Sequence, residues 1–391
     1  MSVTSAQGFT ASGVAAGIKS TGAKDVSVVV NEGPHKVAAG VFTTNRIEAA
    51  PVTWSRQVVA DGRADAVVLN SGGANACTGP EGFQDTHRTA EHVATALQGT
   101  GRDIGAGDVV VCSTGLIGVR LPMDTVLGGA DAAIAGLSAD GGQAAAEGIM
   151  TTDSVAKTAV ASRDDWTVGG MAKGAGMLAP GMATMLCVVT TDAVIDPEVA
   201  KATLASAVGQ TLNRVDSDGC MSTNDTVILM SSGASETAVS AEDFEAALTE
   251  VLASLSRQLV ADAEGAGHDI AVTVKNATTE DAAEAVARAI TRSNLFKTAI
   301  FGNDPNWGRI ISAAGTVPAE VAPYDATTLD VYVNGVQVCR ASGVGDDRDL
   351  VDLTGREVTV VVDLHAGDAT ATVWTNDLTH DYVHENSAYS S

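Results

Sequence analysis

The most constraining feature of the chain is a threonine set between a glycine-rich segment and an apolar run. Thr184 follows Lys173-Gly174-Ala175-Gly176-Met177 and precedes Met185-Leu186-Cys187-Val188-Val189. The apolar run is typical of a buried strand, and the glycines allow a tight loop before it. These residues alone fit two interpretations: a plain turn that enters a core strand, or an N-terminal nucleophile released by cleavage of the Ala183–Thr184 bond.

In the second interpretation the hydroxyl of Thr184 attacks the preceding carbonyl, and the chain cuts itself. The new α-amino group then acts as the base for that hydroxyl, because its pKa of about 7.7–8.0 lies near neutral pH. A threonine paired with its own terminal amine is an established form of activated nucleophile. Under this interpretation the chain is an N-terminal-nucleophile enzyme, and the residues by themselves leave the plain turn equally open.

The charge of the chain limits its partners. The formal net charge is −25 over 391 residues. Nucleic acids and anionic membranes need a basic surface, so neither is an expected partner. An anionic substrate would therefore need a local basic site.

Cysteine usage and apolar runs bear on the compartment. The five cysteines include no Cys-x-x-Cys pair, which is typical of free thiols in a reducing cytoplasm. The N-terminal residues show no signal-peptide pattern, and no run approaches the length of a membrane span. No cluster has metal-ligand spacing, and no Gly-Lys-Ser/Thr follows the glycines as in a phosphate-binding P-loop. We expect a cytoplasmic protein with no metal site.

Hydrophobic periodicity predicts a layered α/β fold. Helical patterns begin at Pro197, Ser240 and Thr278 and run to about residues 212, 260 and 291, and the last two open with the capping-box patterns Ser240-x-x-Asp243 and Thr278-x-x-Asp281. The residues from His365 to Asp368 suggest a hairpin turn between the last two predicted strands. Long amphipathic helices beside many short strands favour an α/β sandwich. The predicted strands are Val26–Val30, Ala66–Leu69, Val109–Cys112, Met185–Thr190, Val227–Met230, Ile270–Val274, Leu329–Val333, Val358–Leu364 and Ala369–Trp374.

Two polar loops follow predicted strands. Cys112-Ser113-Thr114-Gly115-Leu116-Ile117-Gly118 places a hydroxyl and backbone N–H groups at a strand end, as an oxyanion hole requires. A strand-to-helix turn explains the same residues, so both interpretations stay open. Asn70-Ser71-Gly72-Gly73-Ala74-Asn75-Ala76-Cys77-Thr78-Gly79 either lines a pocket or forms a tight turn.

Two further segments are candidates for function. Gly302-Asn303-Asp304-Pro305-Asn306-Trp307-Gly308-Arg309 combines turn residues with an arginine and a tryptophan, and a structural role fits it equally well. Glu264 follows the second predicted helix, where a carboxylate opposes the helix dipole. That position suggests a role for Glu264 outside the helix.

Taken together, these segments resemble the ornithine acetyltransferase family, the glutamate N-acetyltransferases of arginine biosynthesis. Many independent motifs occur in the same order along almost the whole chain. The matching segments are Gly8–Gly13, Gly40–Asn45, Met150–Asp153, Lys173–Leu186, Ser222–Thr226, Asp304–Arg309 and Asn386–Ser391.

The resemblance implies a fold and a maturation step. Family members fold as an αββα-type sandwich related in layout to the N-terminal-nucleophile hydrolases. They cleave themselves between the residues that match Ala183 and Thr184, and the two chains stay together, usually as an α2β2 assembly. The expected chains are therefore residues 1–183 and residues 184–391, the second beginning with the nucleophile.

The resemblance also implies residue roles. Thr184 is the expected nucleophile, and Thr114 with Gly115 the expected oxyanion hole. Lys173 is suited to pair with the α-carboxylate of the substrate, and Glu264 to hold an ammonium group. The expected substrate-binding residues are Thr151, Lys173, Thr184, Glu264, Asn386 and Ser391, of which the last two place the C-terminal tail over the pocket.

The reaction implied is acetyl transfer from N2-acetyl-ornithine to glutamate through an acyl-threonine, without a cofactor. Some family members also accept acetyl-CoA as donor, and the sequence does not decide this. The alternatives are a related self-cleaving amidase or aminopeptidase, and a non-catalytic protein with a glycine-rich nucleotide loop. A denaturing gel and a product assay separate the three.

Overall fold

The computed structural model describes residues 2–179 and 185–388, which form two compact units. The described residues up to Asn213, together with Cys220–Asp262, make the first unit. Arg214–Gly219 and the described residues from Ala263 onward make the second. Within the described residues, no helix is both long and apolar enough to cross a membrane.

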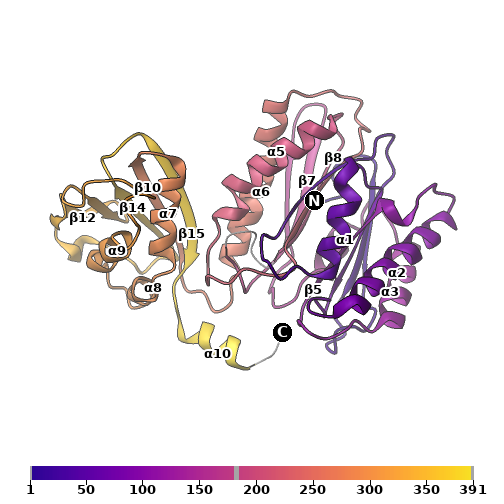
Figure 1. The fold of residues 1–391 in the computed structure, drawn as a ribbon, viewed down its shortest axis with the longest axis horizontal. Coiled ribbons are helices and arrows are strands. Elements are labelled where there is room, and N and C mark those ends of the chain that lie inside the picture. The colour runs from indigo at the N-terminus through magenta and orange to yellow at the C-terminus, as the bar shows by residue number, and fades with distance from the viewer. Residues whose placement is uncertain (1, 180–184, 389–391) are drawn as a thin grey trace. The chain divides into compact units, whose positions relative to one another are not determined.

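Two sheets lie at the centre of the first unit (Figure 1). The first sheet has the order β1-β2-β4-β5, in which only β4 and β5 run parallel. The second has the order β3-β9-β8-β7-β6, in which only β8 and β9 run parallel. The strands of the first sheet are β1 (Phe9–Val14), β2 (Val26–Asn31), β4 (Ala66–Ser71) and β5 (Val109–Thr114). Those of the second are β3 (Val37–Phe42), β6 (Lys157–Ser162), β7 (Thr167–Lys173), β8 (Leu186–Thr191) and β9 (Thr226–Ser231).

Helices cover the outer faces of both sheets, which gives the αββα layers expected from the sequence (Figure 1). α2 and α3 pack on the first sheet, and α5 and α6 pack on the second. Alternate residues of β4 divide between layers: Val67 and Leu69 join the core shared with the second sheet, whereas Ala66 and Val68 pack on the helix side. The helices of this unit are α1 (Ala50–Val58), α2 (Gly79–Gln98), α3 (Met123–Ala135), α4 (Gly142–Gly148), α5 (Pro197–Gln210) and α6 (Ala241–Ala261).

The second unit is built on one sheet with the order β13-β12-β11-β14-β10-β15. α7 packs against β10 and β15, and α9 packs against β11, around a separate apolar core. The strands are β10 (Asp269–Ala277), β11 (Asp330–Val333), β12 (Val336–Arg340), β13 (Gly343–Val344), β14 (Glu357–Asp363) and β15 (Ala369–Asn376). The helices are α7 (Glu280–Thr291), α8 (Asn294–Phe301), α9 (Trp307–Ala314) and α10 (His380–Ala388). Short 3₁₀ turns lie at Val59–Asp61, Ala106–Asp108, Leu212–Arg214 and Arg348–Leu350.

The predicted hairpin at His365–Asp368 is wrong. β14 pairs in parallel with β10, and β15 pairs with the opposite edge of β10 in antiparallel fashion, so β10 lies between them. The connection crosses the end of β10, where the N–H groups of Ala366 and Gly367 donate to the carbonyl of Asn276 at 2.7 and 2.9 Å. A Cβ at Gly367 would lie 2.3 Å from the Ala277 carbonyl oxygen, so the crossing needs glycine there.

The helix starts predicted from capping patterns are half right. Ser240 caps α6: its hydroxyl accepts the N–H of Asp243 at 3.0 Å and donates to the Asp243 carboxylate at 2.7 Å. The predicted cap Thr278 is wrong by one residue, because Thr279 has the extended backbone of a cap and accepts the N–H of Ala282 at 3.1 Å. Each predicted strand matches an observed one with ends shifted by up to three residues.

The predicted cleavage point does not coincide with a boundary between the compact units. β7 and β8, which flank residues 174–185, pair with each other in antiparallel fashion, with Lys173 opposite Leu186. The second sheet therefore takes β3, β6 and β7 from before residue 184, and β8 and β9 from after it. A break between residues 183 and 184 would leave the two segments joined by this sheet.

The cap of α6 yields a stability prediction. Ser240→Ala removes the acceptor for the Asp243 N–H, so we expect the free energy of unfolding to fall by about 0.5–2 kcal/mol. Ser254→Ala, an exposed serine-to-alanine change within the same helix, should change it by no more than about 0.5 kcal/mol. Urea unfolding of both variants measures this, and equal midpoints would show that the cap contributes nothing.

Candidate active site

The turn after β5 presents the residues predicted for the oxyanion hole. Thr114 ends the strand and is 2% exposed. Its carbonyl accepts the N–H groups of Gly72 and Gly73, both at 3.0 Å. Gly115 has a φ of +131°, and a Cβ there would lie 2.5 Å from the Gly73 nitrogen. The close approach of two backbone segments therefore requires glycine at position 115.

Lys173 brings a positive charge to this turn. Lys173 is the last residue of β7 and is 1% exposed. Its Nζ lies 3.4 Å from the Thr114 Oγ1. An ammonium group only donates, so the threonine oxygen accepts here and its own proton is left to donate elsewhere. That polarity suits the binding of an oxyanion at Thr114.

A buried carboxylate balances two buried lysines. The Asp153 Oδ1 lies 2.6 Å from the Lys157 Nζ, and its Oδ2 lies 4.0 Å from the Lys173 Nζ. Asp153 also accepts the N–H of Thr151 at 2.9 Å and that of Gly174 at 2.6 Å. Burial alone would raise its pKa, but the charges of Lys173 and Lys157 and these hydrogen bonds outweigh burial and lower the pKa to about 2.

Lys157 has a second carboxylate partner. Its Nζ lies 2.5 Å from the Asp262 Oδ2, and its side chain is fully buried. Asp153, Lys157 and Asp262 thus form one network, which is joined to the backbone of Thr151 through Asp153. Because Asp262 also pairs with Lys157, two buried lysines face two carboxylates in this network.

Amide side chains connect the segment before β9 to the end of β5. The Asn224 Nδ2 donates to the carbonyl oxygens of Ala74 and Ser113, at 2.6 and 2.9 Å. The Ser113 hydroxyl donates to the Asn70 Oδ1 at 2.6 Å. These buried bonds join the loops after β4 and β5 to Asn224, and a buried polar network that is satisfied in this way is rigid.

Asp225 holds the backbone next to the predicted nucleophile. It is fully buried, and its Oδ1 accepts the N–H of Met185 at 2.9 Å. Burial raises the pKa of this carboxyl well above its ordinary value, against the opposing effect of the Met185 hydrogen bond. The predicted cleavage residues Ala183 and Thr184, and the predicted substrate contact Ser391, lie outside the described residues.

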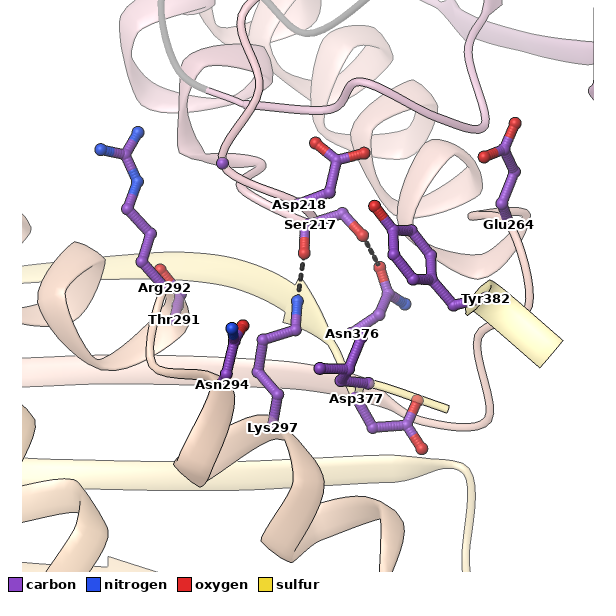
Figure 2. Close-up of a pocket in the computed structure, with 12 residues that line it drawn as sticks. Ser217, Asp218, Glu264, Thr291, Arg292, Asn294, Lys297, Asn376, Asp377 and Tyr382 are labelled. Carbon is purple, nitrogen blue, oxygen red and sulfur yellow. Dashed lines mark hydrogen bonds between the residues drawn. The ribbon is translucent and has the colours of Figure 1, made fainter. Parts of the chain in front are cut away.

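The second unit contains a pocket lined by Glu264. The cavity measures about 160 Å³, and Figure 2 shows side chains of both charges around it. Glu264 is 9% exposed and belongs to the turn that precedes β10. Gly265 follows it with a φ of +61°, where a Cβ would lie 2.1 Å from the Tyr382 nitrogen. This contact fixes the start of α10, and with it Tyr382, at the pocket.

Lys297 from α8 reaches the same pocket (Figure 2). Its ammonium group donates to the Ser217 carbonyl and, at 3.2 Å, to the Thr375 hydroxyl. Burial lowers its pKa to about 8, while the charges of nearby aspartates, Asp218 first, act in the opposite direction. The pocket therefore offers a carboxylate and an amine whose charge changes near neutral pH.

Asn386 lies on the exposed face of α10, and its amide donates to the Tyr382 carbonyl at 3.0 Å.

The segment from 302 to 309 joins α8 to α9. Its Arg309 donates to the Leu295 carbonyl, and Trp307 packs on the core of the second unit. These contacts give Arg309 and Trp307 structural roles in the second unit.

Comparison with known proteins gives the chain its family. Residues 10–391 match the ArgJ family. The chain belongs to the ArgJ family. It is 61% identical over 391 residues to the arginine biosynthesis bifunctional protein ArgJ of Streptomyces avermitilis, with 100% of both chains covered.

Two further proteins similar to this chain come from Mycobacterium tuberculosis. The protein there named arginine biosynthesis bifunctional protein ArgJ is 53% identical over 393 residues, with 100% of this chain and 96% of the relative covered. A crystal structure of ornithine acetyltransferase complexed with ornithine is 59% identical, with 46% of this chain and 94% of that chain covered and a TM-score of 0.45. The family resemblance read from the sequence is confirmed by the match over residues 10–391.

The structure gathers part of the predicted site and adds residues to it. Thr114, Gly115, Lys173 and Thr151 are joined by the contacts described above. Asp153, Lys157 and Asp225 had no predicted role, although Asp153 and Asp225 stand in segments that carry the family resemblance. Nothing in the sequence marks a single aspartate as buried, because burial depends on which strands pair.

The charge network predicts a pH-dependent stability. Asp153→Asn leaves the buried lysines short of a counter-charge, so the free energy of unfolding at neutral pH should fall by about 3–5 kcal/mol. The lowered pKa means that the carboxylate stabilises the fold fully above about pH 4 and loses this effect as the pH falls towards about 2. The difference between variant and wild type should shrink over that range.

Asp131→Asn is the matched control, because Asp131 pairs with His92 while 56% of its side chain is exposed. It should cost no more than about 1 kcal/mol at any pH. Chemical denaturation at pH 7, 5, 4 and 3 provides the measurement. An Asp153→Asn variant as stable as Asp131→Asn at pH 7 would contradict the assigned charge network.

Proposed function

We propose that the chain transfers the acetyl group of N2-acetyl-ornithine to glutamate, with Thr184 as the nucleophile. Membership in the ArgJ family makes it an acetyltransferase of arginine biosynthesis. The observation that carries the chemistry is the Thr114–Gly115 turn, where a hydroxyl polarised by the buried Lys173 ends a strand. The threonine nucleophile and the residue roles rest on the sequence resemblance.

The first half of the reaction forms an acyl-enzyme. The α-amine of Thr184 takes the hydroxyl proton, and the Oγ attacks the acetyl carbonyl carbon. The carbonyl oxygen becomes an oxyanion, stabilised by the Thr114 hydroxyl and the N–H of Gly115. Its collapse breaks the amide bond, and the ornithine nitrogen leaves with the proton held by the amine.

The second half transfers the acetyl group. The α-amino group of glutamate, in its neutral form, attacks the Thr184 ester, and the same oxyanion hole stabilises the second tetrahedral intermediate. The ester bond breaks, the proton returns to the Thr184 oxygen, and N-acetyl-glutamate leaves. Donor and acceptor use one site in turn, so no cofactor is required.

The proposed substrate contacts pair each charged group of the substrate with a side chain of opposite charge. Lys173 binds the α-carboxylate that ornithine and glutamate share, and Glu264 binds the side-chain ammonium of ornithine. Thr151, Asn386 and Ser391 complete the proposed set of substrate contacts. Acetyl-CoA is a proposed second donor, since curated relatives carry the name bifunctional protein.

Self-cleavage between Ala183 and Thr184 is part of the proposal. Its support is the pairing of β7 with β8, which would keep residues 1–183 and 184–391 together after the cut. An α2β2 assembly of these chains in the cytoplasm completes the proposal. A related amidase or aminopeptidase is the alternative, and it predicts free acetate or peptide cleavage instead of N-acetyl-glutamate.

The cleavage and the reaction are tested together. Purified protein should give two bands on a denaturing gel, the second beginning Thr-Met-Leu-Cys on terminal sequencing. Thr184→Ala should run as one band and form no N-acetyl-glutamate, whereas Thr184→Ser should still cleave because it keeps a hydroxyl. The wild type is assayed with N2-acetyl-ornithine and with acetyl-CoA as donors, and release of acetate without N-acetyl-glutamate would favour the amidase.

The oxyanion role of Thr114 gives a kinetic prediction. Thr114→Ala removes one donor, so kcat should fall by about 10²–10³ while KM changes much less. Thr95→Ala, an exposed threonine on α2, should leave both constants near the wild-type values. Normal turnover in Thr114→Ala would remove this residue from the mechanism.

A further inference from the structure

A second lysine lies at the candidate active site and has no role in the mechanism above. Lys19 belongs to the loop between β1 and β2 and is half-buried. Its Nζ donates to the carbonyl oxygens of Met150 and Lys24, at 2.6 and 2.7 Å. Met150 directly precedes Thr151, so the ammonium group of Lys19 is fixed beside a proposed substrate contact.

The backbone of Lys19 is held rigidly. The carboxylate of the buried Asp25 accepts four consecutive backbone N–H groups, from residues 16 to 19, at 2.6 to 3.1 Å. The Asp25 carbonyl also accepts the N–H of Ser71, the residue before Gly72. The lysine is therefore preorganised in the β1–β2 connection, beside the end of β4 that leads into the Gly72–Gly73 turn.

Lys19 also lies close to the oxyanion turn. A Cβ built on Gly72 would be 3.4 Å from the Lys19 Cγ, and Gly72 donates to the Thr114 carbonyl at 3.0 Å. Lys19 is therefore a near neighbour of Gly72, which is bonded to Thr114. Its bond to Met150 connects it to the segment in which Thr151 donates to Asp153, the partner of Lys173. Burial lowers the pKa of Lys19, and the charge of Lys173 lowers it further, while Asp25 acts against both.

The ammonium group of Lys19 can donate one further hydrogen bond. Within residues 2–179 and 185–388, no carboxylate lies within 4.0 Å of it, and two of its three protons go to neutral carbonyls. In a chain with a net charge of −25, two neighbouring lysines around one turn make a local positive site. The two proposed acceptors differ in charge: glutamate carries two carboxylates, and ornithine carries one.

We propose that Lys19 binds the side-chain carboxylate of glutamate, while Lys173 binds the α-carboxylate. Lys19 thereby selects glutamate as the acetyl acceptor and contributes nothing to the binding of ornithine. This inference rests on the proposed function and specifies the dicarboxylate class of its acceptor.

The acetyl-enzyme accepts glutamate in the forward reaction and ornithine in the reverse, so the two acceptors can be compared on one enzyme. Lys19→Met should raise KM for glutamate roughly ten- to a hundredfold, as expected for the loss of one hydrogen bond to a charged group. In the exchange of labelled ornithine into N2-acetyl-ornithine, KM for ornithine should stay the same or fall.

Two matched variants separate charge from structure. Lys19→Arg keeps the positive charge and should retain more of the preference for glutamate than Lys19→Met. Lys24→Met removes a lysine of the same loop, whose ammonium pairs with Glu147 at 2.6 Å, and should leave both KM values unchanged. If Lys19 had a merely structural role, Lys19→Met would change the KM values for both acceptors alike.

The outcomes distinguish this inference from the proposed function. A wild type that performs neither the transfer nor the exchange contradicts the proposed function, and with it the role of Lys19. A wild type that performs both, with Lys19→Met altering the two KM values equally or not at all, overturns the role of Lys19 alone.

Discussion

The buried Asp153 carboxylate is the interaction on which the candidate site depends. Without it, Lys157 and Lys173 would bring positive charge into the protein interior short of a counter-charge, and a buried uncompensated charge is strongly destabilising. The same carboxylate accepts the N–H groups of Thr151 and Gly174. One side chain therefore fixes the start of the loop after β7, the backbone at Thr151 and the position of the lysine that meets Thr114.

The αββα layering explains why these residues meet. β5 ends at Thr114 in one sheet and β7 ends at Lys173 in the other, and their inner faces share one apolar core. Functional groups at the ends of packed strands are held by rigid elements, which suits chemistry that needs a fixed oxyanion hole. The Asn224 amide adds a cross-link between loops that are distant in sequence.

The arrangement of β7 and β8 has a consequence for maturation. β7 and β8, on either side of residues 174–185, pair with each other, and the parallel partner of β8 is β9. A cut between residues 183 and 184 would break one peptide bond and leave the pairing of β8 with β7 and β9 intact. Self-cleavage is thereby compatible with an intact core, and the Asp225 side chain would still accept the N–H of Met185.

Sequence alone determined the local elements and the family. The apolar runs predicted β2, β4, β5, β8 and β9, because strands buried on both faces read as continuous hydrophobic segments. They left out β1, β3, β6 and β7, which are rich in alanine, glycine and threonine and carry no such signal. Thr114, Gly115 and Lys173 were predicted from motifs, whereas Asp153, Asp225 and Lys19 were not. The place of β10 between β14 and β15, and the burial of single charged residues, were decided only by tertiary structure, because strand pairing and desolvation join positions that no local pattern connects.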